Sequence, residues 1–173
     1  MGRALLIFVD GVGIGADDPE VNPVAAARLP HLRALLGGAL PVLPAMDGTG
    51  QIRAERAVAV AVDASLGVAG RPQSGTGQTA LLSGRNAPAL FGRHFGAWVP
   101  TPLRPILARH SIFAATVRAG RRAVFANAGP LPPRDPQRRP PAFPFAAHTA
   151  GLPHRGIHAL LRGEAVPGSL HAH

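Results

Sequence analysis

The sequence predicts an α/β fold with a mostly parallel sheet flanked by helices. Two short apolar runs, Ala4–Val9 and Ala57–Val62, each end at an aspartate, a pattern typical of buried parallel strands. Segments with helical spacing follow each run, so strand and helix alternate along the chain. With 173 residues, of which 46% are hydrophobic, the chain is long enough to bury the core that such a fold needs.

The first predicted strand, Ala4–Val9, leads into Asp10 and a glycine-rich loop. In an open α/β sheet, ligands bind at the carboxyl ends of the strands, so Asp10 is a candidate ligand-binding residue. Residues 24–36 follow Asn22-Pro23, a helix-start pattern, and their apolar residues recur at helical spacing up to Gly37-Gly38. We expect this helix to pack on the sheet.

The second predicted strand, Ala57–Val62, ends at Asp63 and precedes a loop rich in glycine and proline. Ser74-Gly75-Thr76-Gly77 then opens a short helix that Ser83-Gly84 ends, which places Ser74 at a helix N-terminus. Three further elements are expected: helices at about 101–109 and 111–119, and a strand at 123–126.

The last part of the chain differs in composition from the rest. It is rich in proline and arginine from Gly129 to Pro141, and one weak helical pattern follows at 157–162. We therefore expect a domain at residues 1–128 and a weakly structured, Pro/Arg-rich tail at residues 129–173. The fold is expected to be incomplete at its C-terminal end.

The composition excludes several classes of protein. There is no cysteine, which excludes disulfides and thiolate metal sites. Asp10 interrupts the apolar opening after six residues, which is too short for a signal-peptide core or a membrane span. We therefore expect a cytoplasmic protein with no membrane partner.

The formal net charge is +9, and the excess lies in the second part of the chain. Through Leu103 there are 8 arginines and 7 acidic residues, whereas from Arg104 onward 10 arginines face only Asp135 and Glu164. All 18 basic residues are arginine, a bias that a GC-rich genome would also produce. Because these arginines are not interleaved with aromatic residues along the sequence, nucleic acid is not the expected partner.

Ser74 is the residue best placed for chemistry. A hydroxyl in a glycine-rich turn before a helix meets backbone N–H groups that favour an anion such as phosphate. A serine becomes nucleophilic through a nearby base or a divalent metal, and Asp10 would help to supply a metal site. The structural alternatives are a plain turn at Ser74 and a strand cap at Asp10.

Together these residues resemble the alkaline phosphatase superfamily, which includes cofactor-independent phosphoglycerate mutase and phosphopentomutase. Its members have a strand that ends in a metal-binding Asp followed by Gly, matched by Val9-Asp10-Gly11. They also have a Ser or Thr nucleophile that begins a short helix ending in a small residue and Gly, matched by Ser74 and Ser83-Gly84. The likeness runs from about residue 4 to about residue 128, and it is narrowest to bacterial metalloenzyme-domain proteins, through Leu66-Gly67-Val68, Pro72–Ala80, Arg85-Asn86-Ala87-Pro88 and Gly92–Gly96.

The resemblance implies a two-metal phosphoryl-transfer site. Ser74 would be the nucleophile, Asp10 and Ser74 would bind Mn²⁺ or Zn²⁺, and Gly75 and Arg93 would contact a small phosphorylated substrate. His94 would lie near this site because the likeness continues through it.

The chain also departs from the family. Family members carry further Asp and His ligands, including an Asp-His pair near the C-terminus, but this sequence has no Asp-His dipeptide. His154 and His158, at i, i+4 spacing, would be replacement ligands only if a third ligand joined them. We therefore expect a metal site that is incomplete because the chain is truncated or frameshifted.

Three functions follow from the sequence. The first is metal-dependent phosphoryl transfer or phosphoester hydrolysis through Ser74, impaired by the missing ligands. The second is a non-catalytic fragment of such an enzyme, and the third is a basic protein that binds anions or nucleic acid through its arginines. The sequence predicts no particular oligomeric state.

Overall fold

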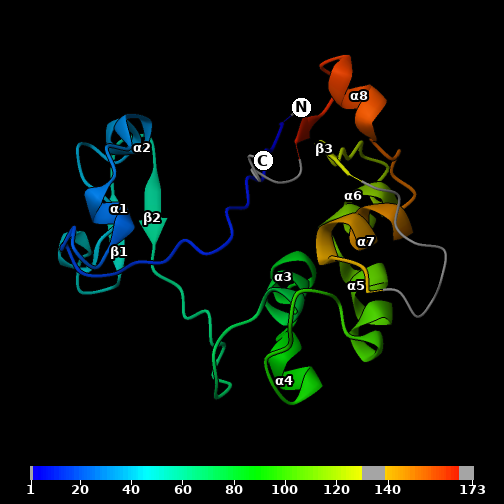
Figure 1. The fold of residues 1–173 in the computed structure, drawn as a ribbon, viewed down its shortest axis with the longest axis horizontal. Helices are drawn as coiled ribbons and strands as arrows, with labels where there is room; N and C mark the ends of the chain where they lie inside the picture. Colours follow the sequence, from blue (N-terminus) through cyan, green and yellow to red (C-terminus); the bar gives the residue numbers. More distant parts are fainter. Residues whose placement is uncertain (1, 130–138, 168–173) are drawn as a thin grey trace. The chain divides into compact units, whose positions relative to one another are not determined.

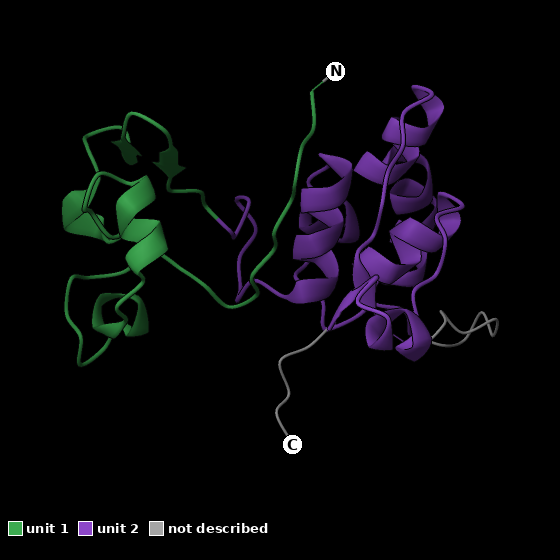
Figure 2. Cartoon of the chain, turned by 90° about the horizontal axis from the view of Figure 1, so that it is seen from above, with its two compact units in different colours: residues 1–63 green, residues 64–173 purple. Residues whose placement is uncertain are grey.

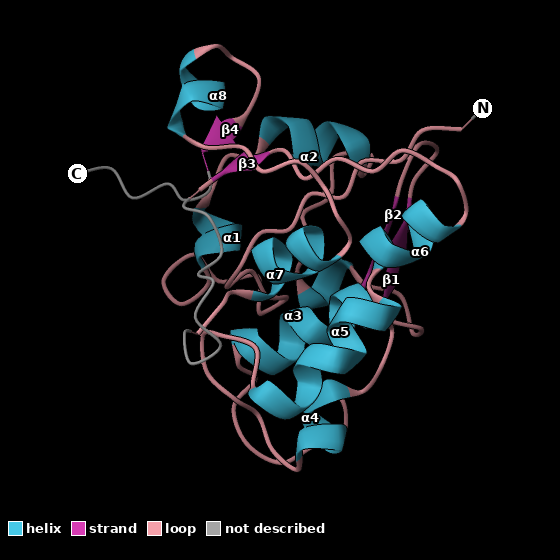
Figure 3. Ribbon diagram, turned by 90° about the vertical axis from the view of Figure 1, so that its right-hand side faces the viewer, coloured by secondary structure: helices cyan, strands magenta, loops and turns pink. Residues whose placement is uncertain are grey.

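The computed structural model describes residues 2–129 and 139–167, and this part of the chain is mostly helical, with 37% helix and 6% strand (Figures 1 and 3). Its strands form two small sheets of two strands each. The predicted α/β fold with a mostly parallel sheet is therefore wrong. Strands of two or three residues provide too few backbone hydrogen bonds to build a sheet on which helices could pack.

The chain divides into two compact units, unit 1 at residues 1–63 and unit 2 at residues 64–173 (Figure 2). Each unit has its own buried residues and is described by itself. The division into residues 1–128 and 129–173 marks the extent of the family resemblance, and it stays a prediction.

Unit 1 contains two short helices where the sequence predicts one. Helix α1 spans Pro23–Ala26 and helix α2 spans Pro30–Leu35. Between them Leu29 has a left-handed backbone (φ 39°), since a residue before proline is disfavoured in the helical region. The predicted helix start is confirmed, because the Asn22 side chain accepts a hydrogen bond of 3.1 Å from the Val24 N–H.

The rest of unit 1 consists of a 3₁₀ turn, η1 (Leu43–Ala45), and an antiparallel pair of strands, β1 (Gln51–Arg53) and β2 (Val58–Val60). Strand β2 lies inside the predicted strand Ala57–Val62. It pairs antiparallel with β1, the strand before it in the sequence, and not in a parallel sheet. The other predicted strand, Ala4–Val9, is not a strand, and its Leu5 side chain is 83% exposed. Within the described residues no strand pairs with this run, so its backbone lacks the ladder that would make it one.

Unit 2 begins with the helix that the sequence places at Ser74. Helix α3 spans Ser74–Ser83 and ends at Gly84, whose left-handed backbone (φ 65°) is the usual helix terminator. The two helices predicted at 101–109 and 111–119 are confirmed as well, with bounds within a few residues of those expected. The other elements of unit 2 up to residue 129 are α4 (Ala87–Phe91), η2 (Thr101–Leu103), α5 (Arg104–His110), α6 (Ile112–Arg118) and β3 (Asn127–Ala128).

The part of the predicted tail that the structure describes contains three short elements. It contains α7 (Ala142–Thr149), α8 (Ile157–Leu161) and β4 (Val166–Pro167), which pairs in parallel with β3. Pro144 is tolerated in α7 because it lies in the first turn, where its missing N–H needs no partner. The expected strand at 123–126 is not formed, and residues 130–138 and 168–173 of the tail lie outside the described residues.

The core of unit 2 lies between helices. Helix α3 packs against α4, α5 and α7, and the largest fully buried side chains are Leu82, Val99, Leu103 and Leu107. Helix α7 contributes the buried side chains of Ala142, Ala146 and Ala147 to this core, and its Phe143 and Phe145 pack against it. None of the helices in residues 2–129 and 139–167 is long and apolar enough to span a membrane.

Candidate functional site

The site predicted from the sequence lies at the start of α3. Gln73 is extended (φ −132°, ψ 145°), and its carbonyl accepts the first helical hydrogen bond, from the Gly77 N–H at 2.9 Å. Ser74 is thus the first residue of the helix, as predicted, and it is half-buried. A short helix start of this kind is determined locally, which is why the sequence reveals it.

The first backbone donors of α3 are used inside the protein. The Gly75 N–H donates to the Gly96 carbonyl, and the Thr76 N–H donates to the Phe95 carbonyl at 3.3 Å. A Cβ at residue 75 would lie closer than 3.0 Å to three carbonyl oxygens, those of Phe95, Gly96 and Trp98. Gly75 therefore lets the loop at residues 95–98 dock on the helix, which is a structural role beside the substrate contact that the resemblance implies.

Two buried threonines lie in this part of α3, and one of them, Thr76, bonds to the same loop. The Thr76 hydroxyl accepts from the Phe95 N–H at 3.2 Å and donates to the Gln73 carbonyl at 3.4 Å. The Thr79 hydroxyl donates to the Gly75 carbonyl at 2.6 Å. Because both side chains are fully buried, their hydroxyls need these partners, and the bond of Thr76 holds the loop at Phe95.

A shallow depression of about 540 Å³ opens beside the start of α3. Gln73, which precedes Ser74, lines it together with three basic side chains, Arg71, Arg93 and His94. The His94 Nε2 lies 3.0 Å from the Val68 carbonyl, which fixes the ring. The structure thus places Arg93 and His94 at one cavity with the residue preceding Ser74.

The predicted metal ligands lie in separate units: Asp10 is an exposed residue of unit 1, and Ser74 belongs to unit 2. Among the described residues, no group of three or more His, Asp or Glu side chains could hold a metal ion. This finding includes His154 and His158, the replacement ligands considered from the sequence. The described residues therefore do not fit the two-metal centre that the resemblance implies.

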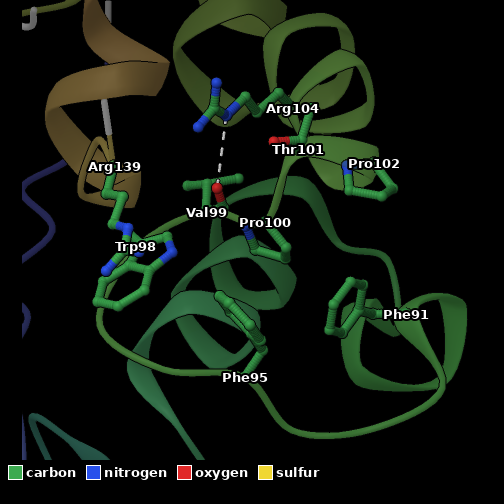
Figure 4. A pocket seen from close by; sticks show the side chains of 9 residues that line it. All are labelled: Phe91, Phe95, Trp98, Val99, Pro100, Thr101, Pro102, Arg104 and Arg139. Atoms are coloured by element: carbon green, nitrogen blue, oxygen red, sulfur yellow. Dashed lines mark hydrogen bonds between the residues drawn. The ribbon is translucent and has the colours of Figure 1, made fainter. Parts of the chain in front are cut away.

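A second depression, of about 260 Å³, was not foreseen from the sequence (Figure 4). Phe95 and Trp98 line both depressions and pack edge to face, with ring centroids 5.7 Å apart. The Phe91 ring packs on Phe95 in the same way, at 5.1 Å. Arg104 and Arg139 supply the charge of this second depression.

Two arginines lie over these rings. The Arg139 guanidinium lies 4.4 Å from the centroid of the Trp98 ring, and the Arg93 guanidinium lies 5.8 Å from the centroids of both Phe91 and Phe95. We call Phe91, Arg93, Phe95, Trp98, Arg104 and Arg139 the aromatic–arginine cluster. The spacing of Phe91, Arg93, Phe95 and Trp98 was a usable signal in the sequence, whereas Arg139 reaches the indole through the fold alone.

The electrostatics of unit 2 are one-sided. It carries 13 arginines against 2 acidic residues, Asp135 and Glu164, of which the structure describes Glu164. Glu164 pairs with Arg162 at 2.8 Å, and the hydrogen bond from this guanidinium holds the pKa of the Glu164 carboxyl below its usual value. The described carboxylate of unit 2 is thus engaged by Arg162 and not by Arg93 or Arg139.

Comparisons of the chain with models of protein families, with curated proteins and with solved structures give no match.

Proposed function

We propose that the chain binds a small phosphorylated molecule beside the start of α3, with Ser74 as the candidate nucleophile, and that it turns this molecule over very slowly. The observation that carries the proposal is that Ser74 begins α3 directly after Gln73, which lines a depression with Arg71, Arg93 and His94. Guanidinium groups are the side chains best suited to phosphate, because their planar donors match its oxygens.

The low expected turnover follows from how serine is activated. Phosphoryl transfer here would form a bond between the Ser74 Oγ and phosphorus and release the alcohol as the leaving group, with the hydroxyl proton passed to a base. A serine needs such a base or a metal ion, and the described residues do not fit a metal centre. Each 1.36 kcal/mol of lost transition-state stabilisation costs about tenfold in rate. Without a metal ion we expect a loss of about 4 kcal/mol or more, which lowers the rate by roughly a thousandfold or more.

Phosphoryl transfer at a useful rate is the second candidate function, and the start of α3 at Ser74 favours it. In that case the coordination of Mn²⁺ or Zn²⁺ would have to be completed by ligands other than the described residues. A cytoplasmic location, expected from the sequence, remains part of the proposal.

Binding is tested with the protein's one tryptophan, Trp98, which lines both depressions and serves as a fluorescence probe. Titration with inorganic phosphate and with glycerol phosphate should change its emission. Arg93→Gln should weaken binding by about 10-fold or more, the cost of a charge-assisted hydrogen bond. Arg85→Gln, which removes an exposed arginine that lines neither depression, is the control, and equal losses in both variants would refute the site.

Turnover is tested with p-nitrophenyl phosphate and a bis-ester analogue in the presence of Mn²⁺ or Zn²⁺. We expect a very low rate that Ser74→Ala abolishes and that Ser83→Ala, at the other end of α3, leaves unchanged. Fast turnover that is lost in Ser74→Ala would establish the second candidate function. A rate that Ser74→Ala does not change would remove Ser74 from the chemistry.

A further inference from the structure

We infer that the aromatic–arginine cluster is a binding site for single-stranded nucleic acid. This site shares Arg93 and the larger depression with the proposed phosphate site, but it does not depend on the chemistry proposed for Ser74. Nucleic acid was set aside on the sequence because arginines and aromatic residues are not interleaved along the chain. Residues 91–98 are a local exception, since Arg93 lies between Phe91 and Phe95 in the sequence and over both rings, and folding adds Arg139 over the Trp98 ring.

The rings offer aromatic surface on which single bases can stack, with neighbouring rings packed edge to face at 72° and 83°. Phe91, Phe95 and Trp98 form a continuous row, with successive centroids 5.1 and 5.7 Å apart. All three side chains are half-buried, so each is anchored in the fold and still reaches the surface. Unpaired bases stack on such rings, whereas bases within a duplex are already stacked and present only their edges.

The cations are held in place by the rings. Arg139 lies on the Trp98 indole, and within the described residues no carboxylate pairs with its guanidinium. A guanidinium fixed in this way keeps its N–H groups for a phosphate oxygen and offers its planar face to a base. Arg104, whose Nε donates to the Val99 carbonyl at 3.5 Å, extends the positive charge along the second depression.

The shape favours a polymer over a single nucleotide. The two depressions are both open, and they adjoin at Phe95 and Trp98, so a linear ligand can lie in one and continue into the other across this pair. The excess of 13 arginines over 2 acidic residues in unit 2 adds long-range attraction for a polyanion. A small anion would gain little from charges spread over the unit.

The experiment is a titration of the full chain with an oligothymidine of about 12 nucleotides, since single-stranded sites cover roughly 4 to 16 nucleotides. Quenching of Trp98 and the anisotropy of a labelled oligomer report binding independently. If Arg93 and Arg139 each neutralise one phosphate, the logarithm of the affinity should fall with the logarithm of the salt concentration with a slope of about −1.4.

Variants separate the cluster from general charge. Trp98→Ala should weaken binding by about 5- to 100-fold, the usual effect of losing one stacked base. Arg139→Gln should weaken binding and lower the salt slope by about 0.7, whereas Arg121→Gln, an exposed arginine outside the cluster, should change the affinity far less. Because Arg139 is exposed, its variant keeps the test valid even if Trp98→Ala does not fold.

Four results would overturn the inference. The first is absence of binding at about 50 mM salt, where electrostatic attraction is strong. The second is an equal loss in Arg139→Gln and Arg121→Gln. The third is equally tight binding of inorganic polyphosphate, which has no bases, and the fourth is equally tight binding of thymidine monophosphate, which would make the site one for a mononucleotide.

Discussion

The two units differ in how their apolar residues are placed. Unit 2 buries Leu82, Val99, Leu103 and Leu107 in one helical core, whereas unit 1 leaves Leu5 and Ile7 exposed by 83% and 73% and has a smaller buried set (Leu36, Leu40, Val42 and Ile52). They also differ in charge, with 5 arginines and 7 acidic residues in unit 1 against 13 and 2 in unit 2. Unit 2 therefore holds the larger apolar core, and its arginine excess is the reason why we assign the proposed anion binding to it.

The largest effect expected from this comparison is on the core of unit 2. Leu82 is fully buried in α3, and its neighbour Leu81 is 48% exposed. Leu82→Ala should lower the free energy of unfolding by about 2–5 kcal/mol, whereas Leu81→Ala should cost less than about 0.5 kcal/mol. Urea denaturation followed by circular dichroism measures both. Similar small losses would show that the helical core of unit 2 is not formed as described.

The next effect concerns the docking of the loop at residues 95–98. Gly75→Ala places a methyl group against three carbonyl oxygens and should lower the free energy of unfolding by about 1–3 kcal/mol. Gly77→Ala is the matched control, because a Cβ there meets nothing within 4 Å, and it should stabilise α3 by up to about 1 kcal/mol. Effects of the same sign in the two variants would contradict the docked loop.

A smaller effect is expected at the helix caps. Ser111 in unit 2 is fully buried and accepts from the Ala114 N–H at 3.2 Å, so Ser111→Ala should cost about 0.5–2 kcal/mol of unfolding free energy. Asn22 caps the four-residue helix α1 of unit 1, and Asn22→Ala should change the same unfolding transition less. A larger loss of unfolding free energy in Asn22→Ala than in Ser111→Ala would mean that unit 1 carries more of the stability than its packing indicates.

The smallest effect is the acid sensitivity of unit 1. A hydrogen bond from the Thr49 hydroxyl, at 2.6 Å, and others from the Thr49 and Gln51 N–H groups lower the pKa of Asp47 below 3.8. Since the folded-state pKa is lowered, the stabilising contribution is present above the unfolded-state pKa and is lost as the pH falls through the folded-state pKa. In the Asp47→Asn variant, the free energy of unfolding of unit 1 should therefore fall less steeply as the pH is lowered below about 4. Carboxyl NMR titration checks the shift, and a pKa of Asp47 above 3.8 would contradict it.

The comparison also explains which parts of the fold the sequence reveals. Helices α3 and α6 were predictable because their signals are local: Gly84 terminates α3, and Ser111 caps α6. The strand at Ala4–Val9 was predicted wrongly, since an apolar run becomes a strand only when another strand pairs with it. Helix α7 was missed because it directly follows the Pro/Arg-rich stretch and itself contains Pro144, which led us to assign it to a weakly structured tail.

The features of the candidate site also divide into local ones, which the sequence predicts, and non-local ones, which it does not. The position of Ser74 at a helix start is a property of its immediate neighbours and could be predicted. The contact of Arg139 with Trp98 joins residues far apart in the sequence, and no local pattern reports it. The hydrogen bonds from the Gly75 and Thr76 N–H groups to carbonyls of the loop are also non-local, because they depend on where residues 95–98 lie in the fold.

The most direct test of this account is amide hydrogen exchange on the full chain, because the helical description and the α/β prediction differ most at Ala4–Val9. We expect strong protection of the amides in α3 and α5 around Leu82 and Leu107, and little protection at residues 5–9, which lie in no helix or strand. Protection of residues 5–9 as strong as that of α5 would show that this run is a paired strand. That result would contradict the helical fold described and restore the parallel sheet with Asp10 at its edge.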